Sequence, residues 1–225
     1  MNGDLYPFVK ATFTITYILL ITTGTIIFIE ALRNKTASFV SHIMNLETAI
    51  SVIAGYFYSK FMTEIEHAEE TNTHLNWDKI NMYRYVDWSI TTPIMLLILC
   101  MFLANNAGKT IHVFTYLTIV VLNYIMLTFG YLGEMQITSR ETGLIGGFIA
   151  FFLMFAIIYV KFVIPKWSMP SNVLFGLYLV VWSLYGVVYV FDTEMKNAIT
   201  NILDLISKCF VGVGLWAYYS KILVR

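Results

Sequence analysis

The sequence predicts an all-α membrane protein, a bundle of seven transmembrane helices. Of the 225 residues, 58% are hydrophobic and only 12% are charged, whereas an ordinary soluble domain carries roughly 25% charged residues. Seven apolar runs are each long enough to cross a hydrocarbon core about 30 Å thick, which takes roughly 20 helical residues. Short polar connections between these runs hold most of the charge. We therefore expect one domain, residues 1–225, that lies mainly in a lipid bilayer.

The predicted spans follow one another without an internal repeat, a low-complexity stretch or a separate linker. The longest connection, TEIEHAEETNTHLNWDK, is strongly acidic and joins the second span to the third. The spans are predicted at residues 8–32, 38–61, 80–104, 110–132, 138–163, 169–191 and 196–221.

The distribution of charge predicts the orientation of the bundle, because basic residues accumulate in cytoplasmic loops. With the N-terminus outside, the outer side holds ten acidic residues and five basic ones, and the inner side holds Glu30 as its one acid. We therefore expect the C-terminus in the cytoplasm. The net charge is zero, so nucleic acid is not an expected partner. The basic residues of the inner side are Arg33, Lys35, Lys109, Lys161, Lys166, Lys221 and Arg225.

Five charged side chains fall well inside the predicted spans. Each is costly in hydrocarbon, so it should face the interior of the bundle, pair with another group and mark a functional site. Two acids, an arginine and a lysine of this set can nearly neutralise one another if their helices meet. The five residues are Glu47, Arg84, Asp87, Asp204 and Lys208.

Their spacing places them on shared helix faces. Asp204 and Lys208 are four residues apart, and Arg84, Asp87 and Thr91 are three and four apart. One interpretation is a buried ion-pair cluster that only fixes helix packing. The other is a reactive lysine, because a desolvated amine is nucleophilic and suited to Schiff-base chemistry.

An aromatic set could form a flat-sided slot for a ligand. Trp88 lies in the third span, and Trp182, Tyr185 and Tyr189 follow at helical spacing in the sixth. Such a stripe is also typical of ordinary helix packing, so the residues alone leave both interpretations open.

Three segments resemble the signature sequences of microbial (type 1) rhodopsins. They are RYVDWSITTP in the third span, WSLYGVVY in the sixth and NILDLISK in the seventh. FGYLGE, at the end of the fourth span, is similar to the proteorhodopsin group in particular. The short chain and tight loops also resemble the rhodopsins of giant algal viruses. The resemblance covers all seven spans in order.

This resemblance implies a chromophore, all-trans retinal, bound to Lys208 as a Schiff base. Asp87 and Asp204 would be its counterions, and Arg84 would lie just outside them. Thr91 would hydrogen-bond to Asp87. Light would move the proton of the Schiff base to Asp87.

Further roles follow from the same resemblance. Tyr58 and Tyr185 would brace the counterion region, and Trp88 and Trp182 would sandwich the polyene. Of the remaining pocket residues, Tyr189 would lie near the ring end, Met95 at a position linked to colour tuning, and Asn123 at a position in the fourth span that is polar in several relatives.

Two positions depart from the pattern of the resembled pumps. Ile98 stands where an acid usually returns the proton to the Schiff base, and Gly186 replaces an expected proline. Glu47, in the second span, could be a displaced proton donor or a carboxylate in a cation path. It could equally be structural, bonded to a polar neighbour such as Asn45.

The predicted function is light-activated ion transport, most simply a slow outward proton pump. The alternatives are a light-gated cation channel, a photosensor that signals through a partner, and, less in keeping with the third span, a receptor of the G-protein-coupled kind. No enzymatic activity and no metal site are expected. The expected partners are the lipid bilayer, protons or small cations, and further copies of the chain. The expected location is the plasma membrane of the host cell.

Overall fold

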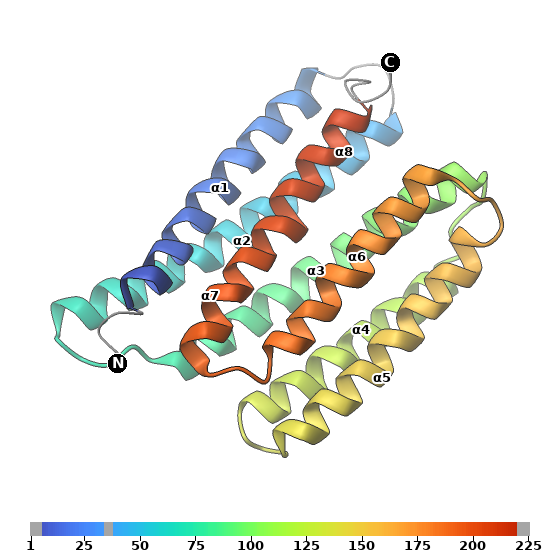
Figure 1. Ribbon diagram of the computed structural model, residues 1–225. Coiled ribbons are helices and arrows are strands. Elements are labelled where there is room, and N and C mark those ends of the chain that lie inside the picture. The colour runs from blue at the N-terminus through green and yellow to red at the C-terminus, as the bar shows by residue number, and fades with distance from the viewer. Residues whose placement is uncertain (1–5, 34–37, 220–225) are drawn as a thin grey trace. The chain divides into compact units, whose positions relative to one another are not determined.

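The computed structural model describes residues 6–33 and 38–219, and these residues are almost entirely helical (Figure 1). One continuous helical segment accounts for most of each predicted span, so the all-helical fold with seven helices is confirmed. The helices are α1 (Tyr6–Arg33), α2 (Ser38–Glu70), α3 (Trp77–Ala107), α4 (Val113–Glu134), α5 (Arg140–Ile158) continued by the π-helix η1 (Tyr159–Val163), α6 (Met169–Val188), and α7 (Thr193–Asp204) continued by the π-helix η2 (Leu205–Phe210) and α8 (Val211–Tyr219).

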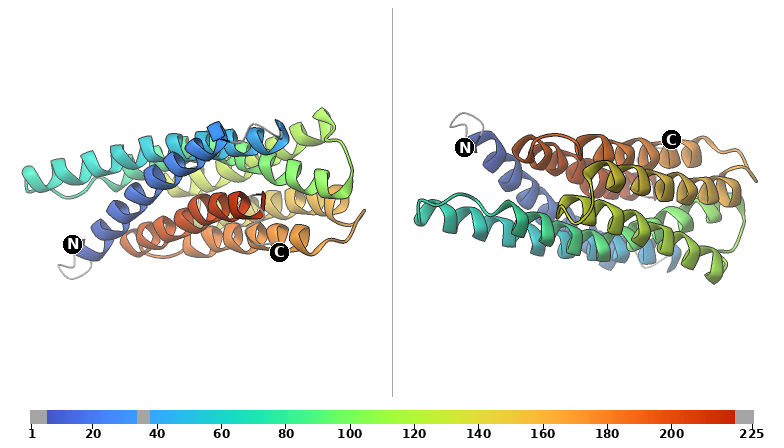
Figure 2. Two further views of the ribbon diagram at one scale, coloured as in Figure 1. Left: turned by 90° about the horizontal axis from the view of Figure 1, so that it is seen from above. Right: turned by 90° about the horizontal axis from the view of Figure 1, so that it is seen from below.

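The chain divides into two compact units, residues 1–87 with 191–225 and residues 88–190. In the first unit, α1 packs along α2 and along the continuous segment α7–η2–α8. In the second unit, α4 and α5 form an antiparallel pair, visible as the yellow-green and yellow ribbons of Figure 2. The expectation of a single domain stays a prediction.

The connection between the second and third spans is shorter than the sequence predicts. Instead of a loop over residues 62–79, α2 continues to Glu70 and α3 already begins at Trp77. The reason is local burial: Ile65 and Ala68 pack with Leu75 into the apolar cluster of the first unit. Alanine and glutamate also favour helix in this segment.

Salt bridges tie the C-terminal end of α2 to α1 and to the start of α3. Lys10 Nζ lies 2.7 Å from Glu69 Oε1, and Lys79 Nζ lies 2.7 Å from Glu64 Oε1. The hydrogen bonds from Lys10 lower the pKa of the Glu69 carboxyl below its usual value. All four residues belong to the side predicted to be outside. Of the charges used for the orientation, Asp4, Lys35, Lys221 and Arg225 lie outside the described residues.

Six of the helical segments are long and apolar enough to cross a membrane, and α2 is not among them. Large apolar side chains point outward along the helices, as for Phe114 at 84% exposed and Phe152 at 56%. Exposed apolar faces of this kind suit contact with lipid rather than with water.

Pro93 lies inside α3 without ending the helix. A proline cannot donate the backbone hydrogen bond to the carbonyl four residues earlier, here that of Ser89. Tyr124 of α4 replaces the missing donor, since its hydroxyl donates to that carbonyl at 3.0 Å. The hydroxyl of Tyr116 likewise donates to the Pro93 carbonyl at 2.9 Å. Two tyrosines of α4 therefore stabilise α3 around its proline.

Candidate functional site: a buried lysine with two carboxylates

Lys208 lies at the centre of the first unit, in the π-helical turn η2. Its side chain is 1% exposed, and its Nζ donates a hydrogen bond to Asp87 Oδ2 at 2.7 Å. Asp204 Oδ2, one turn earlier, lies 3.6 Å from the same nitrogen. Isolated π-helical turns often occur at functional sites. The structure therefore brings together the lysine and the two acids that the sequence predicts.

Arg84 supplies the fourth charge of this cluster. Its side chain is 4% exposed, and Nη1 lies 3.4 Å from Asp204 Oδ2. Two positive and two negative side chains are thus buried within one connected group. Such a group is stable in a low-dielectric interior only because its charges are paired and hydrogen-bonded.

Aromatic rings surround the Arg84 guanidinium. Its Cζ lies 5.0 Å from the ring centre of Phe61, 5.7 Å from that of Phe13 and 5.8 Å from that of Tyr58. The Tyr58 hydroxyl also donates to Asp204 Oδ2 at 2.8 Å. Tyr58 therefore contacts both members of the Arg84–Asp204 pair.

Two asparagines of α7 complete the cluster, and the sequence analysis did not identify them. Arg84 Nη2 donates to Asn197 Oδ1 at 3.0 Å and to Asn201 Oδ1 at 2.8 Å. A signal for them exists in the sequence: residues 197, 201, 204 and 208 are spaced by four, three and four, which is one face of a helix. A neutral amide in an apolar segment is a weaker indication of a functional site than a charged residue, although both asparagines are buried here as fully as the charged residues.

Glu47 forms a separate buried site in the first unit. It is 3% exposed, and its Oε1 has no hydrogen-bond partner among the described residues. The same holds for Ser51 Oγ, one turn further along α2. Gly212 of α8 leaves room for the carboxyl group, because a Cβ atom there would lie 3.1 Å from Glu47 Oε2. Buried polar atoms in proteins are usually hydrogen-bonded to protein or to ordered water, so this site has room for a further polar partner.

The predicted pocket residues of the second unit are also largely buried. The rings of Trp88 and Tyr185 meet edge to face with centres 5.5 Å apart. Trp182 packs against Tyr178 and Phe155, at 5.8 Å and 6.0 Å between ring centres. The sequence analysis did not single out these last two rings.

Polar contacts hold the remaining pocket residues of this unit. Asn123 is fully buried and donates to Thr92 Oγ1 at 2.8 Å, and the Tyr189 hydroxyl donates to the Gly130 carbonyl at 3.1 Å. Met95 is 3% exposed and Thr91 is fully buried. The hydrogen bond from Thr91 to Asp87, the bracing role of Tyr185 and the assignment of these side chains to a retinal pocket stay predictions.

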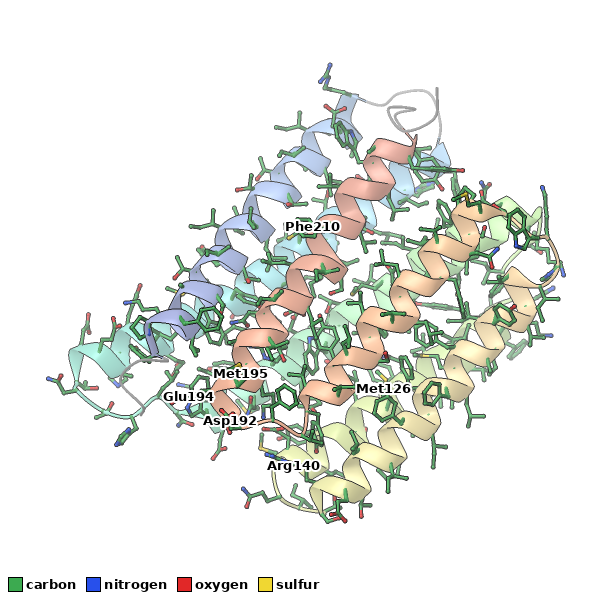
Figure 3. All side chains as sticks on the ribbon, in the orientation of Figure 1. Met126, Arg140, Asp192, Glu194, Met195 and Phe210 are labelled. Carbon is green, nitrogen blue, oxygen red and sulfur yellow. The ribbon has the colours of Figure 1, made fainter. Side chains whose placement is uncertain are left out.

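The positions that depart from the resembled pumps are ordinary in their packing. Ile98 is fully buried. At Gly186, α6 continues without a break, and the ring of Phe148 fills the space that a Cβ would occupy, 2.5 Å away. Asp192 caps α7 by accepting a hydrogen bond from the Met195 backbone N–H at 3.1 Å; Figure 3 shows both residues at the start of that helix.

Comparisons with known proteins agree with this fold. The profile of the family described as "Bacteriorhodopsin-like protein" matches residues 8–222. The solved viral rhodopsin OLPVRII is 42% identical, with a TM-score of 0.86 over 95% of this chain and 98% of that one. Xanthorhodopsin, described as a light-driven ion pump with dual chromophore, shares the fold at 22% identity and a TM-score of 0.76, over 96% of this chain and 93% of its own.

Curated relatives are more distant in sequence. A green-light absorbing proteorhodopsin from gamma-proteobacterium EBAC31A08 is 25% identical over 157 residues, 62% of this chain. The match spans 61% of that protein's length. Opsin-1 of Neurospora crassa is 25% identical over 91% of this chain and 74% of its own length. The resemblance to microbial rhodopsins is thereby confirmed: the chain belongs to the bacteriorhodopsin-like protein family.

Proposed function

We propose that this protein is a slow, light-driven outward proton pump in which Lys208 carries all-trans retinal and Asp87 accepts the transported proton. The family consists of retinal-binding membrane proteins that act as light-driven transporters and photoreceptors, not as enzymes. The chain is accordingly an integral membrane protein. The plasma membrane of the host cell and a homo-oligomeric assembly are parts of the proposal.

The observation that carries the proposal is the 2.7 Å contact between Lys208 Nζ and Asp87 Oδ2. These residues fit retinal chemically, since a buried amine can form an imine and the two carboxylates can balance the resulting cation. Lys208 would hold retinal through Nζ, with loss of water, and the bound group would supply a light-driven isomerisation that moves this nitrogen relative to its acidic neighbours. Asp87 Oδ2 then stands within direct reach of the proton at Nζ.

The other charged residues prepare Asp87 for this transfer. Asp204 lies beside the same nitrogen at 3.6 Å and is held by Tyr58 and Arg84. Arg84 adds a second positive charge, so that the group of two acids and two bases is near neutrality. Because the groups interact strongly, their protonation belongs to the cluster and not to one residue.

The return of a proton from the cytoplasmic side is the step that makes the pump slow. Ile98 has no group that can donate a proton. Glu47 is the candidate replacement, because it is a buried carboxyl with an unsatisfied oxygen in the described structure. We assign it the role of a displaced donor.

The same carboxyl favours a second candidate function, a light-gated cation channel. Glu47 and Ser51 offer oxygen atoms to a cation, and the acidic outer end of α2, with Glu64 and Glu69, would raise the local cation concentration. A photosensor is a third, less supported possibility, since no feature of the described structure identifies a signalling partner.

Photocurrents measured against voltage in cells that express the protein test the proposal. A pump gives outward current at all ordinary potentials, whereas a channel current reverses sign with the ion gradient. Lys208→Ala should abolish both the visible absorption band and the photocurrent. Lys196→Ala is the matched control, because Lys196 of α7 is also a buried lysine and its loss should leave the colour in place. A current that reverses sign with the ion gradient would show a channel and refute the pump. Parent protein that stays colourless after addition of retinal would refute both functions.

A further inference from the structure

Two neutral amides, and not acids, bind the Nη2 atom of the Arg84 guanidinium. Nη2 of Arg84 donates to both Asn197 Oδ1 and Asn201 Oδ1, at 3.0 and 2.8 Å. Asn197 is 1% exposed and Asn201 is fully buried. Hydrogen bonds from a charged donor to a buried acceptor are among the stronger ones in proteins.

The asparagines are themselves held in place from several helices. Asn201 Nδ2 donates to Thr12 Oγ1 of α1 at 2.9 Å, and its Oδ1 also accepts from the Tyr58 hydroxyl of α2 at 3.0 Å. Asn197 Nδ2 donates to the Thr193 carbonyl at 2.9 Å. Each amide is thus oriented with its oxygen toward Arg84, and its NH2 group is used elsewhere. This division of donor and acceptor fixes the amide orientation.

We infer that Asn197 and Asn201 are positioning residues that clamp Arg84 beside Asp204 and thereby set the proton affinity of the Asp87 counterion. An acid at either position would pair with Arg84 and draw its charge away from Asp204 and Asp87. An amide binds the guanidinium without competing for its charge. The inference rests on the proposed function, because it concerns the carboxylate that would receive the proton from Lys208.

The groups that act on Asp87 from the helices of the first unit can be stated. Lys208 of η2 pairs with Asp87 directly, and Asp204 of α7 lies beside the same Lys208 nitrogen. Arg84 of α3 and the Tyr58 hydroxyl of α2 act through their contacts with Asp204. The α1 residues Thr12 and Thr16, which contact Asn201, carry no charge. A release of Arg84 from the clamp therefore removes a fixed positive charge from a group that contains two carboxylates. Asp87 should then bind a proton more readily.

The test is a pH titration of the colour of the retinal-loaded protein, in which protonation of the counterion moves the absorption band to longer wavelength. For Asn201→Leu we expect the midpoint pH of this transition to rise by about one unit or more, a tenfold change in proton affinity. Asn201→Asp keeps the size and the acceptor oxygens and should fold readily. Its added negative charge should also raise the midpoint.

Thr16→Val is the matched control, because the Thr16 hydroxyl donates to the backbone carbonyl of Asn201 at 3.2 Å. The thermal midpoint of each variant is measured without retinal as a second readout. A merely structural role would lower thermal stability in Asn201→Leu and Thr16→Val alike and leave the colour transition at its parental pH. An unchanged midpoint in coloured Asn201→Asp or Asn201→Leu overturns the clamp, whereas colourless parent protein overturns the proposed function instead.

Discussion

Lys208 and Asp87 form the shortest ion pair of the charge cluster, at 2.7 Å, and both side chains are 1% exposed. With retinal held by Lys208 as proposed, the Asp87 carboxylate would stabilise the cation more in the ground state than after photoexcitation. The colour of the protein should therefore depend on this one side chain.

We expect Asp87→Asn to shift the visible absorption band to longer wavelength and to stop proton transport, because an amide neither balances the cation nor accepts the proton. Absorption spectroscopy of the purified variant measures the shift. Asp192→Asn is the control, since Asp192 caps α7 at the surface and asparagine caps helices about as well. A band at the parental wavelength in Asp87→Asn would show that another acid is the main counterion.

Glu47 shows how differently one residue type can be used in the same chain. Glu69, near the end of α2, is exposed and paired with Lys10, whereas Glu47 is buried with an oxygen that has no partner among the described residues. Sequence position alone identified Glu47 as unusual. Both interpretations of Glu47, as a functional carboxyl and as a structural residue, stay predictions.

At the scale of the helix, small residues determine how closely the elements of the first unit approach. Gly24 of α1 faces Ser51 of α2 so closely that a Cβ atom on it would lie 2.8 Å from Ser51 Cβ. Gly212 of α8 similarly leaves space beside Glu47. The buried polar atoms of α2 thus sit where neighbouring helices carry no side chain.

Replacement of Gly24 by leucine should force α1 and α2 apart and destabilise the protein by about 1–3 kcal/mol. Thermal denaturation in detergent, followed by circular dichroism, measures the change. Gly176→Leu in α6 is the matched control, because a Cβ at that position would meet no atom of another segment within 4 Å. Leucine also has a higher helix propensity than glycine, by up to about 1 kcal/mol. Equal thermal midpoints for the two variants would contradict the close approach of α1 and α2.

The π-helical turn around Lys208 is another feature at this scale. A strictly α-helical reading of residues 196–221 predicts the shared face of Asp204 and Lys208 but not the wider turn of η2. A π-helical turn changes the spacing of the backbone hydrogen bonds, and this change leaves no clear pattern in the polarity of the side chains. The turn was therefore not foreseeable from the sequence.

For the whole molecule, the orientation in the membrane is the main open prediction. The acidic end of α2, with its paired residues Glu64 and Glu69, is expected outside, and the connection between α3 and α4 is expected inside. The expectation depends on the excess of basic residues in the inner connections.

Cysteine labelling in intact cells tests this orientation. The native residues Cys100 and Cys209 are 0% and 1% exposed, so a membrane-impermeant maleimide should label the parent weakly. His67→Cys should then react from outside and Thr110→Cys only after the cells are opened, since both positions are exposed. The reverse pattern would place the N-terminus in the cytoplasm.

The sequence by itself determined the membrane class, the seven spans to within a few residues at most ends, and the five charged residues of the interior. These follow from hydropathy and helical spacing, which are local properties of the chain. It did not reveal the extra turns of α2, the Asn197–Asn201 contact with Arg84, or the two tyrosines that stabilise α3 at Pro93. Only the tertiary structure decided these, because each depends on which side chain from a distant segment occupies the space beside an otherwise unsatisfied polar or apolar group.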